Sequence, residues 1–202
     1  MRKLVNGTLL FSLFAASHLA SAGVILQDQD NGVLQVEFYE PVAQSFTAED
    51  SFVSFAFYFD VINAPFPASD LTLSLLSGEG TGGALLTSST FSLAPSFTGY
   101  FDVDFSAVAL TAGSKYTAAL SVVGDSPYWG IRFSTGSPGD SYTGGQLFLG
   151  QPYGGVEEDL ALDARFRVTP AGPVTRVPEP ASLALFGLGL LGMGLARRNR
   201  SR

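Results

Sequence analysis

The chain has 202 residues, no cysteine and a formal net charge of −7 at pH 7. The lack of cysteine excludes a disulfide framework and a thiolate metal site. The acidic balance argues against nucleic acid or anionic lipid as a partner.

Residues 1–22 have the features of a secretory signal peptide, with Arg2 and Lys3 before an apolar segment at residues 9–16. Ala20 and Ala22 supply the small residues that signal peptidase requires, so we expect cleavage after Ala22. An uncleaved N-terminal anchor is the alternative, and the Ala-x-Ala site counts against it.

Residues 23–176 are long enough for one domain with a single core. This segment holds five basic and seventeen acidic residues, a net charge of −12. A solvated acidic surface, repulsion between copies and cation binding all fit that charge. The only histidine, His18, lies in the signal peptide, so the mature domain lacks a histidine base, a Ser-His-Asp triad and a histidine-bound zinc. We therefore expect a protein that is not an enzyme.

Period-two alternation of apolar residues, interrupted by turn residues, runs through this middle segment. Asn31-Gly32 favours a tight hairpin between residues 24–26 and 33–34, because both residues tolerate positive φ. The clearest strand covers residues 51–62, with large apolar side chains at five alternate positions: Val53, Phe55, Phe57, Phe59 and Val61. Further strands are expected at residues 33–38, 71–75, 84–88, 101–105, 116–122, 128–133, 146–149 and 160–168.

No long amphipathic helix is available for parallel crossovers. We therefore predict an all-β fold, an antiparallel β-sandwich of jelly-roll type over residues 23–168. Residues 169–176 read as a linker to the C-terminal tail. An N-terminal signal helix and a short C-terminal transmembrane helix would flank the sandwich.

Two acidic groups are candidate calcium ligands, since calcium prefers oxygen donors. The first is Asp28-x-Asp30-x-Gly32, which departs from an EF-hand loop because its glycine falls one position early. A solvated hairpin tip is the alternative for that motif. The second group is a set of loop acids that repel one another unless water or a cation offsets the repulsion: Asp140, Glu157, Glu158 and Asp159. No other cofactor is expected.

Aromatic and paired acidic residues suggest two further sites. Sugars stack on flat aromatic faces, and four residues in or near the later loops are candidate sugar contacts: Tyr128, Trp129, Tyr142 and Tyr153. The alternative for Trp129 is a place in the core. Asp102 and Asp104 alternate beside Tyr100, and paired carboxylates hydrolyse glycosides, although such pairs are also common on solvated sheet faces.

The last 26 residues combine a proline-flanked acid, an apolar run and a basic end. Val177, Pro178, Glu179 and Pro180 precede a sixteen-residue run at 181–196. A helix over that run would be about 24 Å long, short of a ~30 Å hydrocarbon core. The principal apolar residues of this predicted anchor are Ala181, Leu183, Leu185, Phe186, Leu188, Leu190, Leu191, Met193 and Leu195. The cluster expected to stay cytoplasmic is Arg197, Arg198, Arg200 and Arg202.

This order of parts resembles the PEP-CTERM sorting tail of exported proteins of Gram-negative bacteria. The resemblance implies recognition by an exosortase, a membrane cysteine protease, with processing near Pro178-Glu179-Pro180. It also implies an inner-membrane-anchored precursor and a mature form at the cell surface or in the exopolysaccharide matrix. An ordinary transmembrane anchor is the alternative.

Three functions remain open for the middle domain. The first is a structural or adhesive protein of the surface or biofilm matrix. The second is a carbohydrate-binding module that contacts extracellular polysaccharide through aromatic loops. The third is a hydrolase that uses carboxylates alone. Diffuse likeness to extracytoplasmic sandwich modules, seen in Gln44-Ser45-Phe46 and Trp129-Gly130, assigns no functional residue.

Overall fold

The computed structural model describes residues 23–135, 140–150 and 162–172. These ranges contain thirteen strands and one short 3-10 helix, η1 (Glu37–Tyr39). The strands are β1 (Ile25–Gln27), β2 (Gly32–Gln35), β3 (Val42–Thr47), β4 (Val53–Val61), β5 (Leu71–Ser77), β6 (Leu85–Phe91), β7 (Gly99–Tyr100), β8 (Val103–Asp104), β9 (Lys115–Val122), β10 (Trp129–Ser134), β11 (Leu147–Leu149), β12 (Asp163–Ala164) and β13 (Phe166–Pro170).

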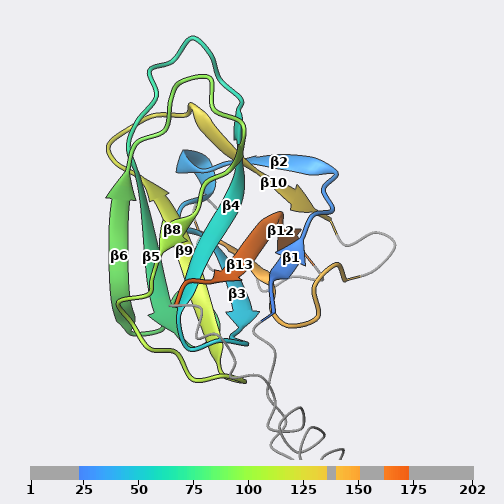
Figure 1. The fold of residues 1–202 in the computed structure, drawn as a ribbon. Coiled ribbons are helices and arrows are strands. Elements are labelled where there is room, and N and C mark those ends of the chain that lie inside the picture. Colours follow the sequence, from blue (N-terminus) through green and yellow to red (C-terminus); the bar gives the residue numbers. More distant parts are fainter. Residues whose placement is uncertain (1–22, 136–139, 151–161, 173–202) are drawn as a thin grey trace, which may run out of the picture.

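The strands form two antiparallel sheets, which confirms the predicted all-β sandwich (Figure 1). The larger sheet has the order β1-β13-β4-β10-β12, with β2 beside β10 and with β7 and β8 beside β4. The smaller sheet has the order β11-β3-β9-β5-β6. Consecutive strands often lie in different sheets, so the chain passes repeatedly between the two layers within the described ranges.

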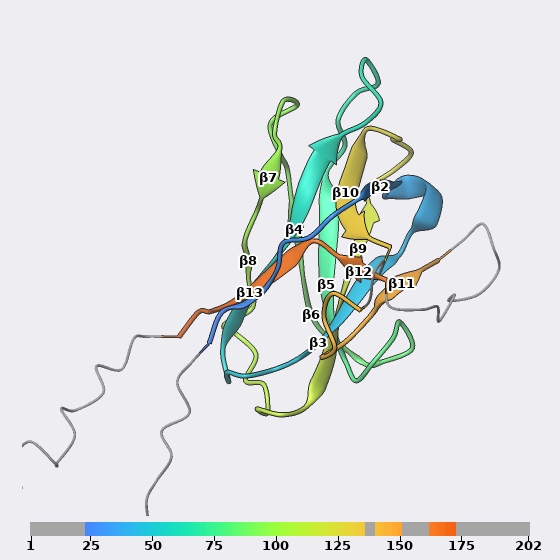
Figure 2. The same ribbon diagram turned by 90° about the vertical axis from the view of Figure 1, so that its right-hand side faces the viewer.

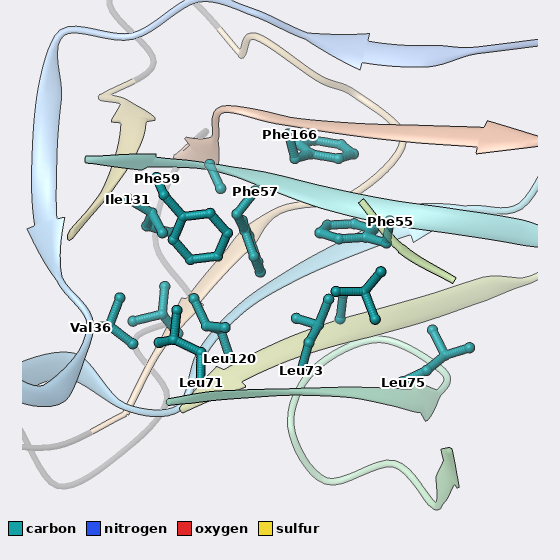
Figure 3. Packing of buried hydrophobic residues seen from close by; sticks show 14 of the residues in the cluster. Val36, Phe55, Phe57, Phe59, Leu71, Leu73, Leu75, Leu120, Ile131 and Phe166 are labelled. Atoms are coloured by element: carbon teal, nitrogen blue, oxygen red, sulfur yellow. The ribbon is translucent and has the colours of Figure 1, made fainter. Parts of the chain in front are cut away.

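Large apolar side chains from the two sheets fill the space between them (Figure 3). Phe55, Phe57 and Phe59 of β4 are at most 1 % exposed, as the period-two pattern predicts. They face Leu71 and Leu73 of β5, which are equally buried. The strand prediction for residues 51–62 is therefore confirmed within one or two residues at each end.

The predicted hairpin at Asn31-Gly32 is wrong. β1 pairs with β13, and β2 pairs with β10, so the two strands flanking this dipeptide are not partners. Asn31 instead bonds to the end of β10: its Nδ2 donates to Thr135 Oγ1 at 2.7 Å, and its Oδ1 accepts from the Thr135 N–H at 3.0 Å. Two long-range hydrogen bonds replace the local turn.

The last predicted strand is divided at Arg165 into β12 and β13. β13 extends to Pro170, which pairs with Val53, so strand pairing continues two residues into the predicted linker. Ile25 of β1 pairs with Val168 of β13, so the first and last strands of the domain lie side by side (Figure 2). Within the described ranges no helix is long and apolar enough to cross a membrane. The predicted signal and transmembrane helices lie outside those ranges.

Candidate functional site

A cluster of charged and aromatic side chains covers the outer face of the larger sheet. We call it the outer-face cluster, and its members are Asp30, Tyr58, Asp60, Tyr100, Asp102, Arg132, Arg165 and Arg167. It contains three of the five basic residues of the acidic middle segment. Its members are linked by ion pairs and by arginine–tyrosine contacts.

Alternation along the strands places these side chains on one face. In β4 the phenylalanines point into the core, so Tyr58 and Asp60 point outward. Arg165 and Arg167 alternate in the same way with buried Phe166. Arg167 is in register with Ala56, whose small side chain leaves room for the arginine to reach across β4.

Ion pairs hold the cluster together across four segments of chain. Arg165 Nη1 lies 2.7 Å from Asp30 Oδ2, and Arg132 Nη1 lies 3.5 Å from the other oxygen of that carboxylate. Arg132 Nε also donates to Asp60 at 2.8 Å. These contacts occupy Asp30, so the structure gives it an ion-pair role in place of the predicted solvated hairpin tip.

Arg167 and the tyrosines extend the cluster towards β7. Arg167 donates two hydrogen bonds to Asp102, and this contact raises the pKa of its guanidinium. The Arg165 guanidinium carbon lies 4.1 Å from the centre of the Tyr58 ring, and that of Arg167 lies 4.9 Å from the Tyr100 ring. The two tyrosine rings pack edge to face at 5.1 Å. The result is a half-buried surface whose side chains are held in place by ion pairs and ring contacts.

The outer-face cluster combines planar groups with hydrogen-bond donors and acceptors. Side-chain exposure is 26 % for Arg165, 33 % for Arg167 and 38 % for Asp102, so part of each remains in contact with solvent. Three arginines balance three aspartates, so the patch is locally neutral on an acidic domain. Such a surface suits a hydroxyl-rich, uncharged ligand better than a phosphate or a metal ion.

A second polar group lies inside the sandwich, around Asp163 of β12. Asp163 and Gln44 are both 0 % exposed. Gln44 Nε2 donates to Asp163 Oδ1 at 3.0 Å, and the backbone N–H of Tyr142 donates to Oδ2 at 2.8 Å. The same Tyr142 N–H lies 2.9 Å from Asp140 Oδ1, so two carboxylates share one donor.

Burial and the neighbouring carboxylate of Asp140 both perturb the titration of Asp163. Burial raises the pKa of Asp163 from 3.8 to about 7, and its hydrogen bond with Asp140 acts in the same direction. Hydrogen bonds from Gln44 and from the Tyr142 backbone oppose that rise. The alternating pattern of the sequence places Asp163 on the same face as Arg165, so nothing in the sequence distinguishes this buried acid from an exposed one.

The sugar-contact prediction is corrected at the lone tryptophan, which belongs to the core. Trp129 is 0 % exposed and its Nε1 donates to the Ser69 carbonyl at 2.9 Å. Tyr128 is 6 % exposed, with its hydroxyl bonded to the Pro95 carbonyl. Tyr142 is partly buried, packs against Phe166 and accepts from the Thr47 N–H. The fourth residue of that prediction, Tyr153, lies outside the described residues.

The remaining predicted acidic residues have different partners or lie outside the described residues. Asp102 belongs to the outer-face cluster, whereas Asp104 is exposed and accepts from the Ser106 N–H at 2.8 Å. That hydrogen bond lowers the pKa of Asp104. Asp140 lies beside Asp163, and residues 157–159 are not among the described ones. Among the described residues no three acidic or histidine side chains converge on a common metal position.

Comparison with known protein families identifies a PEP-CTERM protein-sorting motif at residues 176–200. The match covers the proline-flanked acid, the apolar run and most of the arginine cluster, and it confirms the resemblance seen in the sequence. The sandwich domain lies outside the matched residues. Comparisons with curated proteins and with solved structures gave no match.

Proposed function

Because the chain carries a PEP-CTERM sorting motif, which implies processing by an exosortase and sorting to the cell surface, we propose that it is an exported structural or adhesive protein without catalytic activity. The motif at residues 176–200 carries this proposal. The sandwich is its extracytoplasmic part, and the mature form resides at the surface or in the exopolysaccharide matrix of a Gram-negative biofilm.

The chemistry of the sandwich supports a role without catalysis. Residues 23–176 contain neither histidine nor cysteine, which removes the commonest bases and nucleophiles. Asp102, one of the two acids considered for glycoside hydrolysis, is paired with Arg167, and Asp104 stands exposed. A general acid needs a raised pKa near its substrate, and the acid with that property, Asp163, is fully enclosed.

The finer architecture that we propose is a jelly roll. Strands β2, β10, β4 and β7 follow one another across the larger sheet, and β3, β9, β5 and β6 across the smaller one. This order, with consecutive strands passing between layers, supports that assignment. A fold of this kind provides a rigid spacer with loops at both ends, as a matrix or adhesive protein requires.

Replacement of Glu179 by alanine tests the delivery step. We expect unprocessed precursor, held by residues 181–196, to accumulate in the inner membrane of the native host. Mass spectrometry of membrane and surface fractions measures this outcome. Asp125→Ala, which removes an exposed acid from the sandwich, is the control and leaves processing intact. Unchanged mass and unchanged location of the Glu179→Ala protein would refute recognition of this motif.

The outer-face cluster favours a second function, binding of extracellular polysaccharide. This surface replaces the aromatic loops considered from sequence, because its tyrosines and arginines keep partial exposure while Trp129 does not. Tyr100 and Arg167 combine a ring face with guanidinium donors, the groups that sugars contact.

A glycan array probed with the exported protein, with and without calcium, tests this second function. We expect Tyr100→Ala to lose binding and Thr111→Ala, an exposed turn residue, to keep it. Equal binding by both variants would remove the outer-face cluster from consideration. A requirement for calcium would revive the site suggested by Asp140 and residues 157–159.

A further inference from the structure

The smaller sheet ends in a long unpaired edge formed by β6. This strand has seven residues and pairs with β5 on one side. In the described part of the chain it has no strand on its other side (Figure 1). Within that part of the chain, the other strands with a partner on one side only, β1, β2, β7, β8, β11 and β12, have between two and four residues. β6 therefore presents the longest open row of backbone donors and acceptors among them.

This edge carries little of the usual protection against pairing, apart from a register shift at Leu86 in its pairing with β5. Natural edge strands are kept apart by lysine, proline, β-bulges or very short length. Leu85–Phe91 contains no charged residue and no proline, and residues Thr87–Phe91 pair with β5 in regular register. Leu85 and Leu86 are 61 % and 37 % exposed, and Ser88 and Thr90 are exposed as well. Leucine, threonine and phenylalanine in this strand suit a pleated, half-buried setting.

The distribution of charge along the sequence indicates which partner can pair with the β6 edge. Residues 80–101, which include β6, contain no Asp, Glu, Lys or Arg, whereas residues 23–176 carry a net charge of −12. Two copies of the domain repel each other over most of their surfaces. Along β6 that repulsion is locally absent, so a second copy meets the least electrostatic opposition there.

We propose that β6 is a homotypic docking edge, at which β6 of a second copy adds as an antiparallel strand. The contact is a two-fold symmetric one and joins two five-stranded sheets into one continuous sheet. A two-fold axis through Ser88 places Ser88 opposite the partner's Ser88 and Thr87 opposite the partner's Ser89, within the part of β6 that lies before Phe91 and after the register shift at Leu86. No like charges meet across this axis.

Cysteine cross-linking tests the pairing directly, because the natural chain has no cysteine. Opposite residues in antiparallel strands have Cβ atoms about 4.5–5.5 Å apart, within adjustment of a disulfide. We expect the exported Ser88→Cys protein to form a covalent dimer under mild oxidation at least about tenfold faster than Thr111→Cys. Thr111 is the matched control, an exposed residue in the turn before β9.

Sedimentation of the natural exported protein provides an independent measurement. We expect the dimer fraction to rise with protein concentration and with salt, since salt screens repulsion between the acidic copies. Ser88→Lys places two lysines opposite each other and is expected to shift the protein to monomer, while its melting transition matches that of the natural protein at low concentration, where both are monomeric. A protein that stays monomeric at all concentrations, or equal cross-linking of Ser88→Cys and Thr111→Cys, would overturn the proposal. This test does not depend on exosortase processing.

Discussion

Replacing Asp163 by asparagine is expected to remove most of the pH dependence of stability between pH 4 and 7. The substitution keeps the size of the side chain and its hydrogen bond from the Tyr142 N–H, eliminates the buried charge, and loses the hydrogen bond from Gln44 Nε2. Asparagine can accept from the Tyr142 N–H as Asp163 does, and its amide can donate to Asp140, but that amide cannot accept from Gln44 Nε2. The lost Gln44 hydrogen bond costs the same at every pH, so it does not affect the pH dependence. The variant therefore isolates the ionisation of one carboxyl group.

The sign of the effect follows from the raised pKa. Above pH 3.8 the unfolded chain releases the Asp163 proton, whereas the folded chain keeps it until about pH 7. The unfolded state then binds fewer protons, so the free energy of unfolding falls as pH rises through this window and levels off above it. At about 1.4 kcal/mol per pKa unit the shift corresponds to ~4 kcal/mol as an upper limit. Because Asp140 is exposed and solvent screens part of the repulsion, we expect a loss of ~2 kcal/mol.

Urea unfolding at a series of pH values measures this loss. Trp129, the only tryptophan and fully buried, gives a fluorescence signal for the folded core. At pH 4 we expect Asp163→Asn to be less stable than the natural protein by about 1 kcal/mol, the cost of the lost Gln44 hydrogen bond, and at pH 8 to be more stable by about 1 kcal/mol. Asp125→Asn, at an exposed position, controls for the change in net charge.

Two results would refute this reasoning. One is a natural protein and an Asp163→Asn variant whose stabilities change in parallel from pH 4 to 8. The other is a variant that is destabilised at every pH, which would mean that the carboxylate is needed in its charged form.

Two further substitutions test the packing of the larger sheet. Arg165→Lys keeps a positive charge near Asp30 but loses the planar contact with the Tyr58 ring. We expect the free energy of unfolding in urea to fall by about 1 kcal/mol, and this loss to persist at high salt. A loss that disappears at high salt would mean that the contact is purely ionic. Gly130→Ala places a Cβ 2.7 Å from a Val33 methyl and 3.0 Å from a backbone oxygen of β2, and we expect a loss of about 1–3 kcal/mol. Gly82→Ala, with open space around its Cβ, should change stability little, and an equal loss in both glycine variants would contradict the packing argument.

Much of the sandwich was predictable because burial imposes a simple rule on a strand. A strand packed on one face shows apolar residues at every second position, and β4, with Phe55, Phe57 and Phe59, follows that rule. Register and pairing do not follow from the rule. Asn31-Gly32 has the composition of a hairpin, yet Asn31 bonds to Thr135, about a hundred residues away.

The outer-face cluster and Asp163 show the same limit. Asp30 and Asp102 are distant in sequence from Arg165 and Arg167, so only the pairing of β13 with β4 and the course of the chain bring them together. Asp163 and Arg165 alternate in the same way along the sequence, but Asp163 is fully buried and Arg165 is partly exposed. Local alternation cannot report which loop covers a strand end.

The sorting motif at residues 176–200 was evident from the sequence by itself, as was the presence of an antiparallel sheet sandwich. Short linear signals are read as sequence, and the apolar alternation of a strand is a local property. The tertiary structure alone decided which carboxylates are neutralised by arginine, which one is buried, and which strand is left at an edge. Those properties depend on contacts between residues far apart in the chain, and no local pattern encodes them.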